Sequence, residues 1–312
     1  MHWYEPDTRW DLYAKSREEF VDRFVVEGKF HKNVPEDIVT DFQTVSYIMA
    51  HSYYHWPMFD EAMSKLLLIM EMAIKLKAKA LGIPTKNGKR DKRLVNIIND
   101  VFENDYLKFL KPDFDRARNF RNIKMHPDNL MFMGAMGFTD ANARLFANTI
   151  NLLFLESNEL NKLHSTIHEL ESILKPFKTG IHVLQFQDKK ILIDGFYTFK
   201  YREFENNKLL LLYINPLTTN VHEKFVEKKY PEPLIIAFKD YKIKEESIEG
   251  VDLKGKLMKV YIDDKVQNLK AYINYHKALS KIPEKDKQMF FQLNSSNALW
   301  QMEKIFYENC WS

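Results

Sequence analysis

The stretch MFDEAMSKLLLIMEMAIKLKAKAL, residues 58–81, decides the fold of the N-terminal half of the chain. It contains neither Gly nor Pro, so nothing interrupts a helix within it. Its apolar residues recur at three- and four-residue steps: Met63, Leu66, Leu67, Met70 and Ile74. Gly82 and Pro84 follow directly and are typical of a helix end. The stretch therefore predicts one long amphipathic helix.

Further helical patterns lie on both sides of this stretch. Upstream, Ser16 is expected to cap a helix over 16–27, and a second helix should begin at Glu36 and stop at the segment HSYYHWP, residues 51–57. Downstream, the expected helices cover 92–102, 106–110, 112–125 and, with one break, 139–174. We therefore expect an all-helical bundle from residue 36 to residue 178, preceded by an arm with one helix, residues 1–35.

The pattern changes after Lys175-Pro176 and Gly180, which favour a domain boundary. Short segments rich in β-branched and aromatic residues now alternate with turn residues. They predict strands over 181–186, 190–196, 209–214, 234–238 and 257–262, and helices over 264–279 and 297–307. The expected fold class is α+β, in which the helical bundle is followed by a smaller α+β domain, 181–312, with a mostly antiparallel sheet.

The composition limits what the chain can be. Its 312 residues are 45% hydrophobic and 29% charged, which is enough for two ordinary domains. The net charge of +3 permits nucleic-acid binding without requiring it. A single cysteine, Cys310, excludes a disulfide and a Cys-rich zinc site. The N-terminus does not resemble a signal peptide, and the most apolar run, Leu66 to Met70, is too short to cross a bilayer, so we expect a cytoplasmic protein with no membrane partner.

The segment RARNFRNIKMHPD, residues 116–128, carries the chemistry. It places Asn122 directly after Arg121, and His126 five positions beyond that arginine. Cleavage of RNA without a metal needs a group that moves a proton at the 2′-hydroxyl or the leaving oxygen, and a fixed cation for the charge that develops on phosphorus. A histidine, whose pKa lies near 6.5, suits the first task, and an arginine suits the second. Asn122 would orient either group or bind the phosphate.

This arrangement resembles the HEPN superfamily, whose motif is an arginine, four to six further residues and a histidine, often with Asn after the arginine. In that family the motif lies late in a helical domain, after a long helix that often carries a central glutamate, here Glu71. The resemblance covers about 140 residues. It implies a metal-independent endoribonuclease without cofactors, which leaves a 2′,3′-cyclic phosphate.

The resemblance also implies roles and partners. His126 would be the acid and base, Arg121 the phosphate ligand and Asn122 its polar partner. Two copies would form a homodimer with one composite site that binds RNA. Such domains commonly serve as toxins or as antiviral, abortive-infection effectors against phage. The C-terminal domain would then sense a trigger ligand, hold RNA or bind a regulatory protein.

Other basic residues are candidates for substrate binding. Lys89, Arg90 and Arg93 belong to the polar loop TKNGKRDKR, which either contacts phosphates or is simply solvated. Lys124, Arg116 and Arg118 lie near the motif, where they would extend a basic groove or form ion pairs on the helix surface. Two alternatives remain open: an inactive HEPN module that dimerises or binds nucleotides, with the C-terminal domain as its recognition element, and an unrelated helical structural protein.

Overall fold

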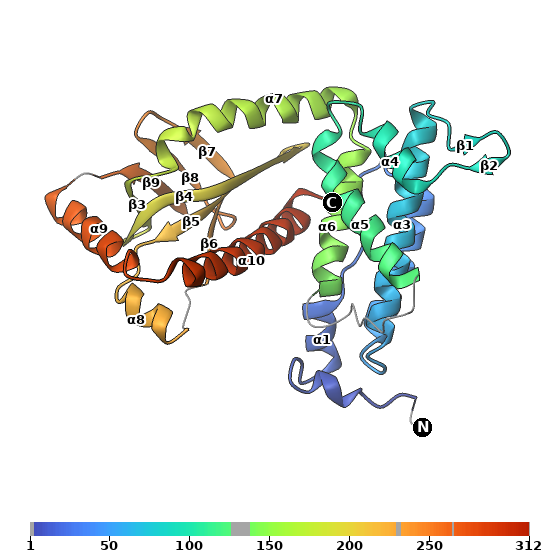
Figure 1. Ribbon diagram of the computed structural model, residues 1–312, viewed down its shortest axis with the longest axis horizontal. Helices are drawn as coiled ribbons and strands as arrows, with labels where there is room; N and C mark the ends of the chain where they lie inside the picture. The colour runs from blue at the N-terminus through green and yellow to red at the C-terminus, as the bar shows by residue number, and fades with distance from the viewer. Residues whose placement is uncertain (1–2, 126–137, 229–231, 264, 312) are drawn as a thin grey trace. The chain divides into compact units, whose positions relative to one another are not determined.

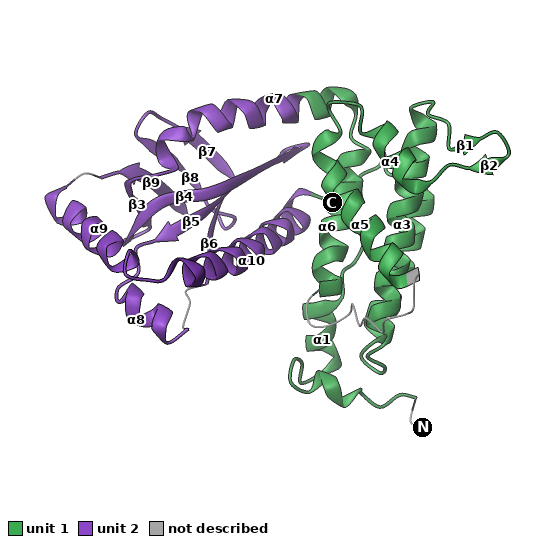
Figure 2. Cartoon of the chain, viewed as in Figure 1, with its two compact units in different colours: residues 1–161, 311–312 green, residues 162–310 purple. Residues whose placement is uncertain are grey.

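The computed structural model describes residues 3–125, 138–228, 232–263 and 265–311 (Figure 1). The chain is α+β, and it divides into two compact units (Figure 2). The helical unit comprises residues 1–161 with 311–312, and the sheet unit comprises residues 162–310. Our expected boundary lay at 178–181, whereas the units divide between Asn161 and Lys162, inside a helix.

The helical unit contains long helices joined by short connections. Ser16 caps the first of them, and its hydroxyl accepts a hydrogen bond from the Glu19 amide at 3.2 Å. Gly82, at a φ of +70°, follows the end of the long helix predicted over 58–81. The elements are η1 (Thr8–Trp10), α1 (Arg17–Phe24), α2 (Glu36–His51), α3 (Met58–Ala80), β1 (Lys86–Asn87), β2 (Arg90–Asp91), α4 (Leu94–Val101), η2 (Lys108–Leu110), α5 (Lys111–Met125), α6 (Phe138–Leu153) and the start of α7 (Ser157–Ile173).

Helix α3 is the central helix of this unit and packs against α2, α4, α5 and α6. Its predicted apolar positions are buried, with Leu66 and Ile74 completely inaccessible to solvent. The interruption at 51–57 is also packed, because the Trp56 ring lies 4.0 Å from the ring of the buried Trp10. The three- and four-residue spacing thus correctly predicted which face of α3 meets the core.

Helix α6 is buried from Thr139 to Leu153 apart from Ala141, although it carries several polar side chains. These side chains bind other segments of the same unit. The Asn151 amide nitrogen donates to the Lys29 carbonyl at 2.9 Å, and the Trp311 indole N–H donates to Asn148 Oδ1 at 2.6 Å. A buried polar group costs stability unless it is hydrogen-bonded, so these partners allow a polar helix to lie inside the unit.

The sheet unit surrounds one antiparallel sheet. Its elements are the remainder of α7, η3 (Lys175–Phe177), β3 (Ile181–Phe186), β4 (Lys189–Phe204), β5 (Asn207–Pro216), α8 (Val221–Val226), β6 (Leu234–Phe238), β7 (Asp240–Ile243), β8 (Ser247–Val251), β9 (Leu257–Ile262), α9 (Val266–Leu279) and α10 (Glu284–Cys310). Helix α10 packs along β4, β5 and β6 (Figure 1).

The seven strands have the order β6-β5-β4-β3-β9-β8-β7, with every neighbouring pair antiparallel. Strands β6 and β7 stand at opposite ends of this order, yet only Lys239 separates them in the chain. The sheet must therefore curl until its two ends approach each other. The Lys239 amide donates to the Val251 carbonyl at 2.9 Å, which fixes this bend against β8.

None of the helices that the structure describes combines the length and the apolar character that a bilayer-spanning segment requires.

Gly250 on β8 makes the close approach at the bend possible. A Cβ atom there would lie 2.1 Å from the Asp240 carbonyl oxygen and 2.9 Å from the Phe238 ring. We expect Gly250→Ala to lower the free energy of unfolding by about 1–3 kcal/mol, because the backbone of β7 must shift. Urea denaturation followed by circular dichroism measures this change.

Gly255→Asn is the matched control. Gly255 has a φ of +77° with no atom within 4 Å of an added Cβ, and Asn tolerates this conformation. Its urea midpoint should stay close to that of the wild type. Identical midpoints for Gly250→Ala and the wild type would show that the bend does not need a glycine.

Candidate functional site

Helix α5 carries most of the segment that contains the candidate chemistry. Pro112 and Asp113 lie in its first turn, where proline is tolerated and an acidic residue favours helix formation. The helix ends at Met125, so Arg121, Asn122 and Lys124 all lie in its last two turns. His126 lies outside the described residues.

Arg121 is held by a carboxylate from the middle of α3. Its Nε atom lies 2.7 Å from Oε2 of Glu71, and the two side chains are 32% and 15% exposed. The N–H is not aimed at this oxygen, so the contact is an ion pair rather than a well-aligned hydrogen bond. The other oxygen of Glu71 accepts a hydrogen bond from Lys75 Nζ at 2.6 Å. Glu71 therefore fixes two cations on one surface of the helical unit.

Asn122, the next residue along α5, is exposed. Within the described ranges its amide has no hydrogen-bond partner, and the neighbouring Ile123 is 40% exposed. The end of α5 thus presents a partly exposed guanidinium followed by an amide that is available to a ligand.

Arg116 and Arg118 have internal partners. Arg116 Nε donates to Asn142 Oδ1 at 3.1 Å, and its guanidinium lies over the rings of Phe120 and Phe138. Burial lowers the pKa of Arg116, which remains a strong base. Arg118 donates to Asn119 Oδ1 at 3.1 Å and lies 3.7 Å from Asp115. Arg116 therefore joins α5 to α6 rather than widening a basic groove.

Lys124 likewise contacts the protein itself. Its ammonium group donates to the Asp60 carbonyl at 2.6 Å and to the hydroxyl of Ser64, and Glu61 lies 3.9 Å away. We expected this lysine to bind substrate, but its donors are engaged by the first turns of α3. Spacing along α5 could not reveal these partners, which are some sixty residues away in the sequence.

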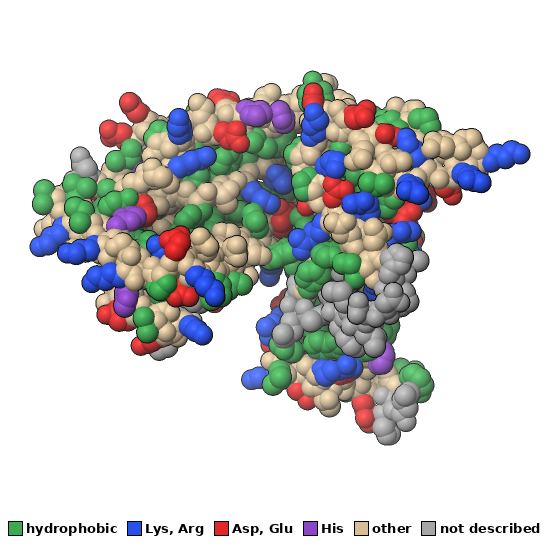
Figure 3. Space-filling view, in the orientation of Figure 1, with side chains coloured by type: hydrophobic (Ala, Val, Ile, Leu, Met, Phe, Trp, Pro, Cys, Tyr) green, Lys and Arg blue, Asp and Glu red, His purple; other side chains and the backbone are tan. Residues whose placement is uncertain are grey.

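The basic loop expected at 86–93 contains a small β-hairpin. Strands β1 and β2 pair through Lys86↔Asp91 and Asn87↔Arg90, and Gly88 adopts a φ of +62° in the two-residue turn. The signal that could have predicted it is Gly88 at the first position of the turn Gly88-Lys89, where glycine is favoured. Lys89, Arg90 and Arg93 are exposed, and basic side chains extend along this hairpin in Figure 3. Lys92, in contrast, is ion-paired with Asp100.

The contacts of Lys124 lead to a test of its role. Lys124→Met keeps the aliphatic stem but removes the donors to α3, so we expect the free energy of unfolding to fall by about 1–2 kcal/mol. Lys65→Met is the control, since it removes a partly exposed ion pair with Asp41 and should cost at most about 1 kcal/mol. If Lys124→Met leaves stability unchanged but weakens RNA binding, Lys124 binds substrate, as the sequence predicted.

No family model, no curated protein and no solved structure matches this chain. The residues of α5 and their contacts are therefore the basis for a functional assignment.

Proposed function

We propose that this protein is a metal-independent endoribonuclease of the HEPN type, with Arg121, Asn122 and His126 as its catalytic residues. The observation that carries the proposal is the ion pair between Arg121 and Glu71. It joins the arginine of the motif to the central glutamate of the long helix, the two features on which the family resemblance depends. An arginine that stood on α5 by chance would have no particular reason to pair with Glu71.

The pair leaves Arg121 able to bind a phosphate. A guanidinium has five N–H donors, and Glu71 approaches through Nε. Among the described residues, Arg121 has no second ion-pair partner, so its terminal nitrogens can face a phosphodiester. A positioned arginine of this kind stabilises the charge that develops on phosphorus during attack.

The proposed reaction needs no group beyond these side chains. His126 of one copy would accept the proton of the 2′-hydroxyl, whose oxygen attacks phosphorus. The bond to the 5′-oxygen breaks, and that oxygen takes up a proton from the protonated His126 of the second copy. The products are a 2′,3′-cyclic phosphate and a 5′-hydroxyl. Both roles of histidine depend on a pKa near neutrality.

The proposal includes a homodimer. Five helical positions correspond to a rotation of about 140°, so Arg121 and His126 would meet only if the helix breaks between them or if a second copy supplies the partner. A second copy can supply the missing group of each pair, which makes the site composite. An effector of this kind would act as a toxin or in antiviral defence in the cytoplasm, restrained until its trigger arrives.

Replacing the arginine tests the catalytic assignment. Arg121→Ala should reduce the rate of RNA cleavage in EDTA on the order of 10²–10³-fold, because the developing charge loses its fixed cation. Lys75→Ala is the matched control: it removes the other cation on Glu71 but leaves the motif intact, and should cleave at nearly the wild-type rate. If Arg121→Ala cleaved RNA at the same rate as the wild type, the proposed site would be wrong.

A second candidate function is a non-enzymatic HEPN module that dimerises or binds nucleotides. The same ion pair favours it, because Glu71 partly neutralises the one arginine that would bind the scissile phosphate. The assay in EDTA separates the two functions. Cleavage of RNA supports the nuclease, whereas stable binding without cleavage supports the module.

The exposed cations of the β1–β2 hairpin should contribute to RNA binding whether the protein is a nuclease or a non-enzymatic module. Lys89→Glu with Arg90→Glu should weaken binding and lower the slope of log affinity against log salt by about 1.4, the value for two single-strand phosphate contacts. Lys15→Glu with Arg17→Glu changes the charge equally at exposed positions before and within α1. Equal affinities of the two double variants would exclude the hairpin from the RNA surface.

A further inference from the structure

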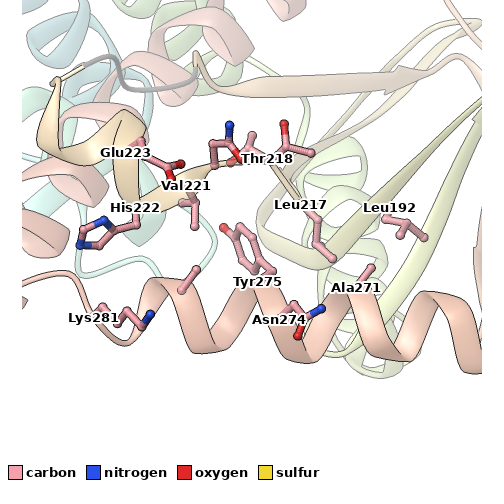
Figure 4. Close-up of a pocket in the computed structure, with 13 residues that line it drawn as sticks. Leu192, Leu217, Thr218, Val221, His222, Glu223, Ala271, Asn274, Tyr275 and Lys281 are labelled. Atoms are coloured by element: carbon pink, nitrogen blue, oxygen red, sulfur yellow. The ribbon is translucent and has the colours of Figure 1, made fainter.

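The sheet unit contains an open cleft of about 550 Å³ (Figure 4). It lies between α9 on one side and the segment that leads from β5 into α8 on the other. Leu192, Leu217 and Ala271 supply its apolar part, and the Tyr275 ring lies in its middle. The volume is within the range of about 300–1,000 Å³ that is usual for small-molecule and nucleotide-sized ligands.

Four polar side chains of this cleft are available to a ligand. Among the described residues, Thr218, Asn274, His222 and Lys281 have no hydrogen-bond or ion-pair partner in the protein. Figure 4 places His222 and Lys281 at the same end of the cleft, on α8 and just beyond α9. The cleft therefore offers hydroxyl and amide groups along its length, with a cation and a titratable imidazole at one end.

Unpaired lysines continue from this end along α9. Lys270 and Lys277 are exposed, and with Asn274 they follow the helical steps that bring residues to one side of α9. Lys281 follows just beyond the helix end and lines the same cleft as Asn274. The positions of Lys270 and Lys277 are about 10 Å apart along the helix axis. No acidic residue occurs between 265 and 283, so this stripe of three lysines, Lys270, Lys277 and Lys281, carries uncompensated positive charge.

Two carboxylates that lie next to α9, in space or along the chain, have partners of their own. Asp194 accepts a hydrogen bond from the Tyr272 hydroxyl at 3.1 Å and lies 3.1 Å from His276 Nε2, on another side of α9. Glu284 pairs with Lys287 at 2.8 Å. Glu223 is the carboxylate that lines the cleft itself, on the α8 side. Among the described residues the three lysines have no carboxylate partner, and such a local excess of positive charge points to an anionic ligand.

We infer that the cleft and the lysine stripe of α9 bind a single strand of RNA. The apolar part beside Tyr275 would receive one base, Thr218 and Asn274 would meet the ribose, and the lysines would follow the phosphates. A duplex keeps its bases stacked inside the helix, whereas a single strand can turn one base out into such a cleft, which favours a single strand. The inference rests on the proposed function, because it assigns the binding of the RNA substrate to the sheet unit.

The experiment measures binding without cleavage. The probe is a fluorescent oligoribonucleotide of about 12 nucleotides, within the range of known single-strand site sizes, carrying 2′-O-methyl groups so that no internal attack occurs. In fluorescence anisotropy with the full chain, Lys270→Glu, Lys277→Glu and Lys281→Glu together should weaken binding at least tenfold. The slope of log affinity against log salt should fall by about 2, the value for three phosphate contacts.

A matched triple variant controls for net charge. Lys189→Glu, Lys254→Glu and Lys256→Glu change the charge equally at exposed positions, the first residue of β4 and the β8–β9 turn. This variant should bind almost as the wild type does. Equal losses in both triple variants would overturn the inference, because they would reflect only the net charge. Two further outcomes would overturn the inference. One is equal affinity of the wild type for the single strand and for a duplex of the same sequence. The other is binding to anionic vesicles without binding to the strand.

The outcome is distinguishable from that of the proposed function. Loss of strand binding in the α9 variant, with no cleavage of natural RNA by the wild type, would support this surface and refute the nuclease. Cleavage that depends on Arg121, with unchanged strand binding in the α9 variant, would refute this surface and leave the nuclease in place. Asn274→Trp, which fills the cleft from its exposed rim, should reproduce the loss without altering any charge.

Discussion

The packing of α3 against four other helices is the constraint on which the helical unit depends. It buries an apolar face completely and leaves one narrow strip of the helix for charged residues. Glu71 lies on that strip at 15% exposure, where a carboxylate is stable only beside cations. Lys75 of α3 itself and Arg121 of the neighbouring α5 supply these cations. The candidate site is therefore a consequence of helix packing.

The elements that the sequence predicts well are those whose periodicity extends over several turns. Helices α2, α3, α5 and α9 and the strands β3, β5, β6 and β9 were expected near their observed positions. The missed elements are short or depend on distant partners. Strands β7 and β8 are four and five residues long, and they form because Lys239 carries the chain to the opposite end of the sheet. Helix α10 begins at Glu284, well before the expected 297, because its early turns pack Phe290 into a cluster with α8.

The candidate site was predictable in its residue types but not in its contacts. The motif identified Arg121 and Asn122, and both lie at the exposed end of α5. Arg116 and Lys124 carry the same charge on the same helix, yet they bind Asn142 and the start of α3. A charge in the sequence shows only that a cation is present. Whether it binds the protein or a ligand depends on the partners that folding brings to it.

This distinction explains why the net charge says little about this chain. Its 46 basic and 43 acidic side chains nearly cancel, and many of them pair, as Lys92 does with Asp100 and Lys124 with α3. Exposed cations that have no carboxylate partner among the described residues include Lys89 and Arg90 of the β1–β2 hairpin and Lys270 and Lys277 of α9, one group in each unit. An anion that approaches these cations displaces water and salt ions, because none of them is ion-paired with a carboxylate of the described residues. Attraction to a nucleic-acid strand is therefore set by these local surpluses, and a protein of net charge near zero can still carry two of them.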